Sequence, residues 1–381
     1  MKRVVNTVIM FIFGISFCMA QNIRDAAEEQ RRREAQQRQV AEEFKRREAQ
    51  QQPQQQAQQQ VQPQPQPQAQ PQQQQPQAQP QPLPQQPQAP EELTTMVTSA
   101  GTLLRGSTLA NKLDWLQRRA ESHNTYIVEV NANENIAPRT LQYTGAINIT
   151  VILKGDGANR TVRLSSNGTM FIIKSNVTFI LDNNITLQGH RRESGGMVYV
   201  DGGTFIMNAG SSITDNIATG SNLFGAGVFI NSGTFTMNGG TISGNVVSSG
   251  GAGVYVANNF GSSATFTMTG GTISGNTSAE GGGVYVGGTF TMRGGTITGN
   301  AATKNGGGVY FRSGTFTKVG GTITGYNSDQ KNGNAVRDDD GIIARSGHAV
   351  YIHHYSSPKR KETTAGSNVN LSNSGEDNWD Q

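Results

Sequence analysis

A unit of three short segments recurs through the second half of the chain, and this repetition constrains the fold more than any other feature. One copy reads Gly282-Gly-Val-Tyr-Val286, Gly288-Thr-Phe-Thr-Met292 and Gly294-Gly-Thr-Ile-Thr-Gly-Asn300. Three β-prone segments in about 25 residues, with Gly and Asn between them, are typical of one coil of a parallel β-helix. A propeller blade needs about forty residues and four strands, so it fits worse.

The first segment of the unit returns at unequal intervals. Successive copies lie 30, 26, 30, 25 and 41 residues apart, so the strands keep their sequence while the connecting loops vary in length. We therefore predict an all-β domain of stacked parallel coils. The copies begin at Val198, Val228, Val254, Val284, Val309 and Val350.

Alternation along each strand assigns side chains to faces. In Val-Tyr-Val the two valines share the inner face, and in Thr-Phe-Thr-Met the Phe and the Met do, so the threonines point outward. The aromatic residue between the valines must then face outward too, and stacked coils place its copies above one another. We predict an external aromatic column that acts either as a ladder stabilising a flat sheet or as a binding platform. Its members are Tyr199, Phe229, Tyr255, Tyr285, Tyr310 and Tyr351.

The asparagine that ends each unit predicts a second ladder, at a corner of the coil. Asn suits this place because it tolerates left-handed backbone geometry and can hydrogen-bond to the next coil. The expected members are Asn216, Asn245, Asn276 and Asn300.

Before the repeats, the chain divides into segments of different composition. Residues 1–20 carry Lys2, Arg3 and then a short apolar run, which is typical of a cleaved secretory signal peptide, with lipidation at Cys18 as the alternative. Residues 21–50 mix opposite charges at helical spacing and predict a charged helical spacer. Residues 51–90 are almost only Gln and Pro, which predicts a disordered tether. We expect an extracellular or cell-surface location and, once the signal is removed, no transmembrane span.

The region 91–124 is predicted to cap the repeat domain, which then occupies residues 125–381 with a polar C-terminal cover. Ser107 is expected to cap an amphipathic helix, after which ordered structure continues as strands. Leu109, Leu113 and Leu116 fall on one face of that helix. We expect them to cover the open N-terminal end of the solenoid, whose bare strand edges would otherwise invite aggregation.

The Gly-Gly-Gly-Val-Tyr-Val and Gly-Gly-Thr-Ile-Ser-Gly-Asn segments resemble the repeats of bacterial surface and adhesin-like proteins. That resemblance spans roughly Thr125 to Asn370 and implies a right-handed, pectate-lyase-like β-helix. It is weak for function, since the same coil supports lyases, hydrolases and passive adhesins. Export, tether and rigid rod together favour a non-catalytic adhesin that binds a host or environmental glycan or the extracellular matrix. The alternatives are a polysaccharide lyase or glycoside hydrolase, and a structural envelope protein.

Charged side chains are scarce in the regular coils, which bears on catalysis. Between Ile217 and Asn300 the only ones are Glu280 and Arg293. An enzyme of this fold is expected to gather Asp, Glu, Arg or His from at least three coils into one groove, so we predict no catalytic residues and no resident cofactor.

Two smaller possibilities concern metal and water. Asp338, Asp339 and Asp340 are adjacent carboxylates that could bind Ca²⁺ in a folded loop. The Thr-x-Thr pattern resembles that of ice-binding β-helices, although loops of unequal length are expected to disturb a regular lattice.

Basic and acidic residues are interspersed between Arg24 and Glu48 and the net charge is +4, so no nucleic-acid partner is expected.

Overall fold

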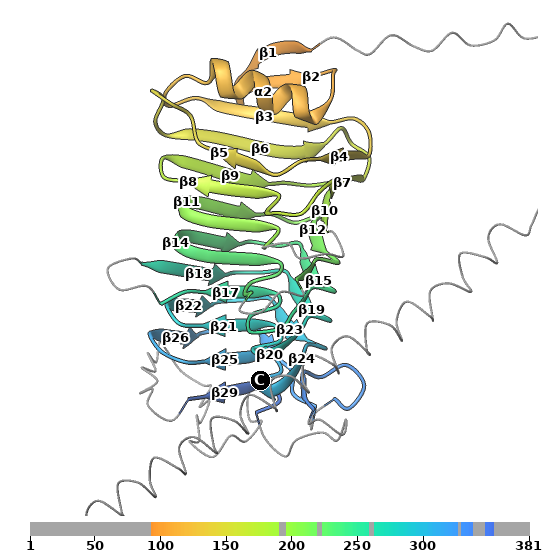
Figure 1. Ribbon diagram of the computed structural model, residues 1–381, viewed down its shortest axis with the longest axis vertical. Coiled ribbons are helices and arrows are strands. Elements are labelled where there is room, and N and C mark those ends of the chain that lie inside the picture. Colours follow the sequence, from red (N-terminus) through yellow and green to blue (C-terminus); the bar gives the residue numbers. More distant parts are fainter. Residues whose placement is uncertain are drawn as a thin grey trace, which may run out of the picture. The chain divides into compact units, whose positions relative to one another are not determined.

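The computed structural model describes residues 93–189, 196–218, 223–258, 263–326, 329–337 and 347–353. These residues form a parallel β-solenoid, which confirms the all-β prediction. Figure 1 shows the coils stacked in chain order, from the first strands to the last. The predicted signal peptide, charged spacer and Gln/Pro-rich tether lie outside the described residues.

The first and largest sheet bends into two sides of the solenoid. Long strands β11 (Val198–Met207) and β14 (Val228–Met237) run through both sides and turn at Gly202 and Gly233, where φ is +88°. Glycine adopts this backbone geometry without steric cost. One side, which we name the aromatic side, contains β5 (Arg139–Leu141), β8 (Phe171–Lys174), β17 (Val254–Val256), β21 (Val284–Val286), β25 (Val309–Phe311) and β29 (Val350–Ile352). On the other, the threonine side, lie β1 (Thr94–Thr98), β2 (Gly101–Arg105), β3 (Thr125–Val130), β6 (Ile149–Gly155), β9 (Val177–Leu181), β18 (Ala264–Met268), β22 (Thr289–Met292) and β26 (Thr315–Lys318).

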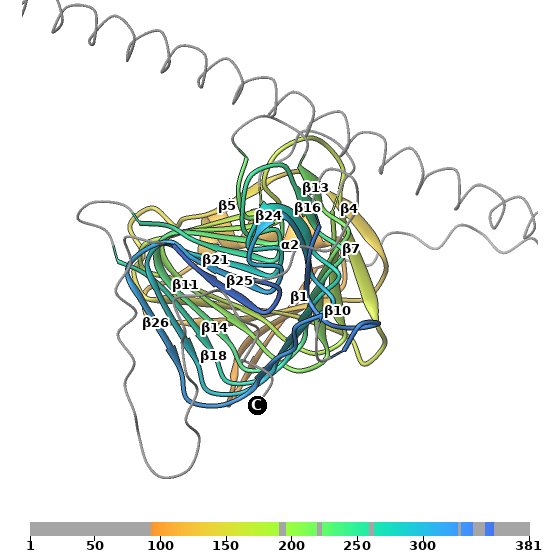
Figure 2. The same cartoon turned by 90° about the horizontal axis from the view of Figure 1, so that it is seen from below.

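Two smaller parallel sheets close the coil, and Figure 2 shows the sheets arranged around the axis of the solenoid. The second sheet contains β4 (Glu134–Ile136), β7 (Arg160–Leu164), β10 (Ile185–Gln188), β12 (Ser211–Thr214), β15 (Thr241–Ser243), β19 (Thr272–Ser274), β23 (Thr296–Thr298) and β27 (Thr322–Ile323). The third contains β13 (Ile217–Ala218), β16 (Val246–Val247), β20 (Thr277–Glu280), β24 (Ala301–Asn305) and β28 (Ala335–Val336).

Identical residues lie above one another in the core, as alternation predicts. The six copies of the first segment pair in register from Val198 to Val350. Inward phenylalanines of the threonine side stack with ring centroids 4.7 to 5.8 Å apart. This ladder buries the largest apolar side chains of the coils and consists of Phe179, Phe205, Phe235, Phe266, Phe290 and Phe316.

The predicted asparagine ladder is present and fully buried. The side-chain amide of Asn245 donates to Asn276 Oδ1 over 2.9 Å, and that of Asn276 donates to Asn300 Oδ1 over 2.9 Å. A fifth member, Asn334, accepts from Asn300 over 2.8 Å. The expected reason for Asn was wrong in one respect: the left-handed residue is the preceding one, at φ +57° to +67°, namely Asp215, Gly244, Gly275 and Gly299.

A helix covers the N-terminal end of the solenoid, as expected. In α2 (Leu109–Arg119), the one helix among the described residues, Leu109, Leu113 and Leu116 are buried in the main core. The capping residue differs from the prediction. The residue that caps the helix is Thr108, whose Oγ1 accepts from the Asn111 backbone N–H.

Ordered strands also begin before this helix rather than after it. Strands β1 and β2 form an antiparallel hairpin, and β2 extends the solenoid by pairing parallel with β3. The hairpin was not predicted, although Gly101, at φ +135°, follows its turn.

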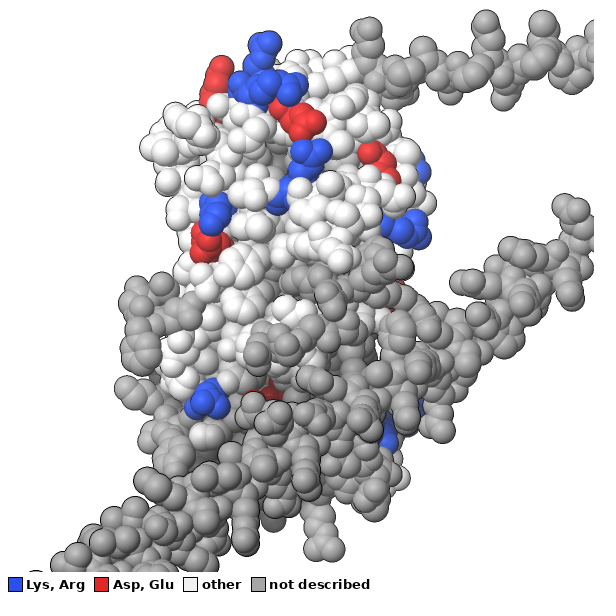
Figure 3. Space-filling view, in the orientation of Figure 1, with Lys and Arg blue, Asp and Glu red and all other residues white. Residues whose placement is uncertain are grey.

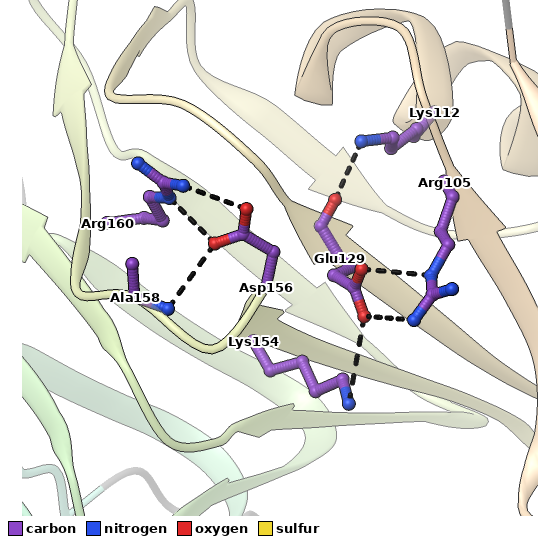
Figure 4. Close-up of polar contacts among 7 residues, drawn as sticks. All are labelled: Arg105, Lys112, Glu129, Lys154, Asp156, Ala158 and Arg160. Carbon is purple, nitrogen blue, oxygen red and sulfur yellow. Dashed lines mark hydrogen bonds and ion pairs between the residues drawn. The ribbon is translucent and has the colours of Figure 1, made fainter.

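Polar contacts attach this cap to the first coil (Figure 4). The buried Lys112 Nζ donates to the backbone carbonyl of Glu129 over 2.6 Å. The Glu129 carboxylate pairs with Arg105 at 3.0 Å and with Lys154 at 3.9 Å. Since Lys112 comes from the helix, Arg105 from β2 and Lys154 from β6, Glu129 joins three elements of the N-terminal end.

Replacing Asn276 tests the buried ladder. Asn276→Ala leaves the buried backbone and side-chain N–H groups of Asn245 without their acceptor, which costs about 3 kcal/mol of unfolding free energy. The matched control is Asn238→Ala in an exposed corner ladder, with an expected cost below about 1 kcal/mol. Urea denaturation measures both variants, and equal losses would show that burial does not determine the ladder's contribution.

Replacing Leu113 tests the cap. Leu113→Asp places a carboxylate in the apolar end of the core, so we expect a loss of at least about 3 kcal/mol or soluble aggregates. Gln117→Asp introduces the same charge at an exposed position of the same helix and should unfold within about 1 kcal/mol of the original chain. Thermal melting with light scattering distinguishes these outcomes, and an unchanged Leu113→Asp melt would contradict the role of the cap.

Candidate functional site

The predicted aromatic residues form one continuous column on the outer face of the aromatic side. Neighbouring ring centroids lie 5.0, 4.9, 4.6, 5.1 and 5.5 Å apart along the solenoid. This spacing follows from the in-register pairing of their strands, which places each ring above its counterpart. The column contains Tyr199, Phe229, Tyr255, Tyr285, Tyr310 and Tyr351.

The column is not open along its whole length, which corrects the expectation of an external surface. Tyr285 is only 6% exposed and Tyr310 only 1%, whereas the other four rings are half-buried. The two buried hydrophobic clusters contain none of the six, although Phe229 and Tyr255 pack against the larger one. What alternation along a strand could not predict is the chain that packs over these two rings.

That covering chain is a line of residues through which each coil returns to the aromatic side, named here the return ladder: Phe224, Gly250, Glu280 and Asn305. These residues pair in parallel with one another. The Phe224 ring lies 4.7 Å from that of Tyr255, one coil further on. Gly250 lies directly against Tyr285, because a Cβ built there would come within 2.9 Å of the tyrosine Cδ2. A glycine at Gly250 therefore permits the close packing that buries Tyr285.

Charged side chains gather where Glu280 of the return ladder meets the buried tyrosines. Burial raises the pKa of the Glu280 carboxyl above its ordinary range, and the positive charges of Lys304, Arg312 and His353 partly offset this effect. The Arg312 guanidinium hydrogen-bonds to the Tyr310 phenol. Desolvation raises the pKa of Tyr310 to about 12, so its hydroxyl stays protonated at neutral pH.

These groups come from successive coils. Glu280 ends β20, Lys304 lies in β24, Arg312 follows β25 and His353 follows β29. The His353 ring packs edge-on against that of Tyr310, with centroids 6.3 Å apart. Elsewhere on this face, as seen in Figure 3, the visible charged side chains lie mainly over the first coils. Glu280 is isolated in the sequence of the regular coils, yet charged and ionisable side chains of later coils lie near it.

A second polar cluster lies beside the first ring of the column. Lys174 forms an ion pair with Asp201 and holds the pKa of that carboxyl below its ordinary range. Asn231 Nδ2 also donates to Asp201 Oδ1 over 3.1 Å. Because Asp201 follows Tyr199 by two residues, the Lys174–Asp201 ion pair lies next to the N-terminal ring of the column.

The predicted calcium ligands Asp338, Asp339 and Asp340 lie outside the described residues. Within the described ranges no three His, Cys, Asp or Glu side chains are placed to hold a metal ion. Asp329, from the same long interval, accepts hydrogen bonds from the backbone N–H groups of Lys331 and Asn332 in its own turn. His348 is buried and accepts from the Val336 backbone N–H over 3.0 Å, so its visible role is structural.

Comparison with protein-family models, with curated proteins and with solved structures finds no match to this chain. In the part of the chain that the structure describes, no helix has the length and apolar character needed to cross a membrane. The aromatic column and the Glu280 cluster therefore form the candidate functional site of this chain.

Titration of Glu280 is a direct test of this cluster. A carboxyl with a raised pKa in the folded state contributes stability that is fully present below its unfolded pKa of about 4.3 and is lost as the pH rises through the folded value. Glu280→Gln removes this dependence. The unfolding free energy of Glu280→Gln relative to the original chain should therefore increase between pH 4 and pH 7. Urea titrations across that range measure it, and a constant difference would show that Glu280 is not desolvated.

Proposed function

We propose that this chain is a non-catalytic binding rod of the exported, surface-displayed kind, which holds a glycan or matrix polymer against its aromatic column. A right-handed, pectate-lyase-like coil of the adhesin type is part of the same proposal. The observation that carries it is the column itself, six rings in register along the solenoid with the Glu280 cluster at one end.

The chemistry of the column suits a polymer of sugars. Aromatic rings offer flat apolar area at a low cost in conformational entropy, and phenol groups orient a polar ligand by hydrogen bonding. The half-buried rings of Tyr199, Phe229 and Tyr255 repeat every 4.9 to 5.0 Å, so an extended chain laid along this part of the rod meets an aromatic ring at each of three successive coils. Arg312 and Glu280 add a donor and an acceptor for hydroxyl or carboxyl groups.

The half-buried rings are the ones to replace in a binding test. Tyr199→Ser and Tyr255→Ser, together in the full chain, should weaken binding to a retained glycan or matrix component at least tenfold, with little loss of stability. Tyr326→Ser removes a tyrosine outside the column and serves as the matched control. The measurement is a glycan and matrix array followed by titration of one retained component.

Tyr285→Ser provides the reference for a purely structural loss. Since Tyr285 is nearly buried, its replacement should cost about 3 kcal/mol of stability whether or not the column binds a ligand. If the Tyr199 and Tyr255 variants also lost stability and kept their binding, the column would be a structural ladder and the protein an envelope component. Retention of no glycan or matrix component by the original chain would refute the proposal.

Cleavage of the bound polymer is the second candidate function. It is favoured by one observation, the raised pKa of Glu280 beside Arg312 and His353, because a higher pKa brings a carboxyl closer to the range in which it can act as a general acid. Incubation of the retained polymer with the full chain, followed by sizing of the products, tests it. Shortened products that disappear in Glu280→Gln would establish an enzyme in place of a passive rod.

A further inference from the structure

The threonine side carries an uninterrupted outward column of one residue type. Eight threonines pair in register, one from each successive coil, and each is half-buried by its neighbours. They are Thr125, Thr150, Thr178, Thr204, Thr234, Thr265, Thr289 and Thr315.

A second column lies two residues further along the same strands. Its first four members are isoleucines and its last four are threonines, again in register. In the last four coils the outer face is therefore a Thr-x-Thr array two columns wide, without a charged side chain at any of these positions. The members are Ile127, Ile152, Ile180, Ile206, Thr236, Thr267, Thr291 and Thr317.

This array is regular, as the phenylalanines beneath it show. Each of these strands has an inward Phe between its two outward threonines. The ring planes differ by only 7° from Phe235 to Phe266, by 6° to Phe290 and by 4° to Phe316. Successive strands therefore repeat one side-chain orientation.

The array is also evenly spaced, although the loops differ in length. Ring centroids beneath it repeat every 4.7 to 5.1 Å, and the two columns lie about 6.6 Å apart along the strand. The expectation that unequal loops disturb the lattice was wrong for these strands, because the additional residues are taken up between strands without altering the register. A corner ladder beside the columns, Asp182, Asn208, Asn238 and Thr269, holds neighbouring coils together by side-chain hydrogen bonds.

We propose that this threonine face binds ice. Each hydroxyl offers one donor and two acceptors at a fixed lattice position, and each methyl group separates neighbouring hydroxyls. A regularly repeating pattern of this kind complements a partner that is itself a lattice of donors and acceptors. The surface is uncharged at these positions, which matches a neutral partner.

Ice satisfies this description better than a crystalline polysaccharide does. Sugar rings gain much of their affinity by stacking on aromatic rings, and the outward positions of both columns carry only Thr and Ile. The outward aromatic column lies on the strands of a different side of the solenoid, so the proposal goes beyond the binding rod and does not depend on it (Figure 2).

Thermal hysteresis of the full chain, together with partition into a slowly grown ice hemisphere, tests the proposal. We expect the original chain to lower the freezing point below the melting point and to enter the ice. The double substitution Thr265→Tyr and Thr267→Tyr places bulky rings on the regular array. It should reduce thermal hysteresis at least tenfold. Thr265→Val with Thr267→Val keeps the shape, preserves folding and should give a smaller reduction by removing only hydroxyls.

The matched control is Thr272→Tyr, on the second sheet of the same coil, which should leave hysteresis unchanged while circular dichroism verifies folding of every variant. Absence of hysteresis and of ice partition in the original chain would overturn the proposal. So would a loss caused by Thr272→Tyr alone, which would move the site to another face. Adsorption to crystalline cellulose or chitin that the Thr265 and Thr267 variants abolish, without any effect on ice, would likewise replace ice by a polysaccharide.

Discussion

In-register stacking of like residues on successive coils is the constraint on which this structure depends. Each coil buries only a thin layer of apolar side chains, so it is stable only when the next coil covers that layer. The Phe ladder supplies the apolar part of this contact, and the Asn ladder supplies buried hydrogen bonds at the corner. Both fail if a strand slips by one residue, because a slip exchanges the inner and outer faces. Register is therefore the most strongly determined property of the solenoid.

The same register creates the two outer surfaces that carry the functional proposals. Because identical residues align, a single aromatic position per coil becomes a column, and a single Thr-x-Thr per strand becomes a lattice. The two sides nevertheless differ in regularity. Rings on the threonine side remain within 4° to 7° of parallel over the last coils, whereas neighbouring rings of the aromatic column differ by 3° to 33°. A regular surface suits a crystalline partner, and a less regular one with polar groups suits a polymer.

The return ladder explains why the aromatic column varies along its length. One position of this ladder holds Phe224, then Gly250, Glu280 and Asn305 in successive coils. The first three lie near a ring of the following coil. An aromatic residue extends the stacked surface, a glycine lets the chain approach closely, and a carboxyl brings charge to the phenols. The single Glu280 thus changes the chemistry of one part of an otherwise repetitive face.

The sequence by itself determined the coil, the inner and outer faces, the membership of the aromatic column, four of the five ladder asparagines and the capping helix. These follow from local rules, since alternation has a period of two and the Gly and Asn corners repeat visibly. Asn334 could also have been found, because Gly333-Asn334-Ala335 matches Gly299-Asn300-Ala301. Only the tertiary structure decided that Tyr285 and Tyr310 are covered, that Glu280 meets Arg312 and His353, and that the threonine array keeps one register despite unequal loops. Each of these depends on how one coil packs against another or folds back on itself, and such contacts join residues whose spacing in the chain follows no rule.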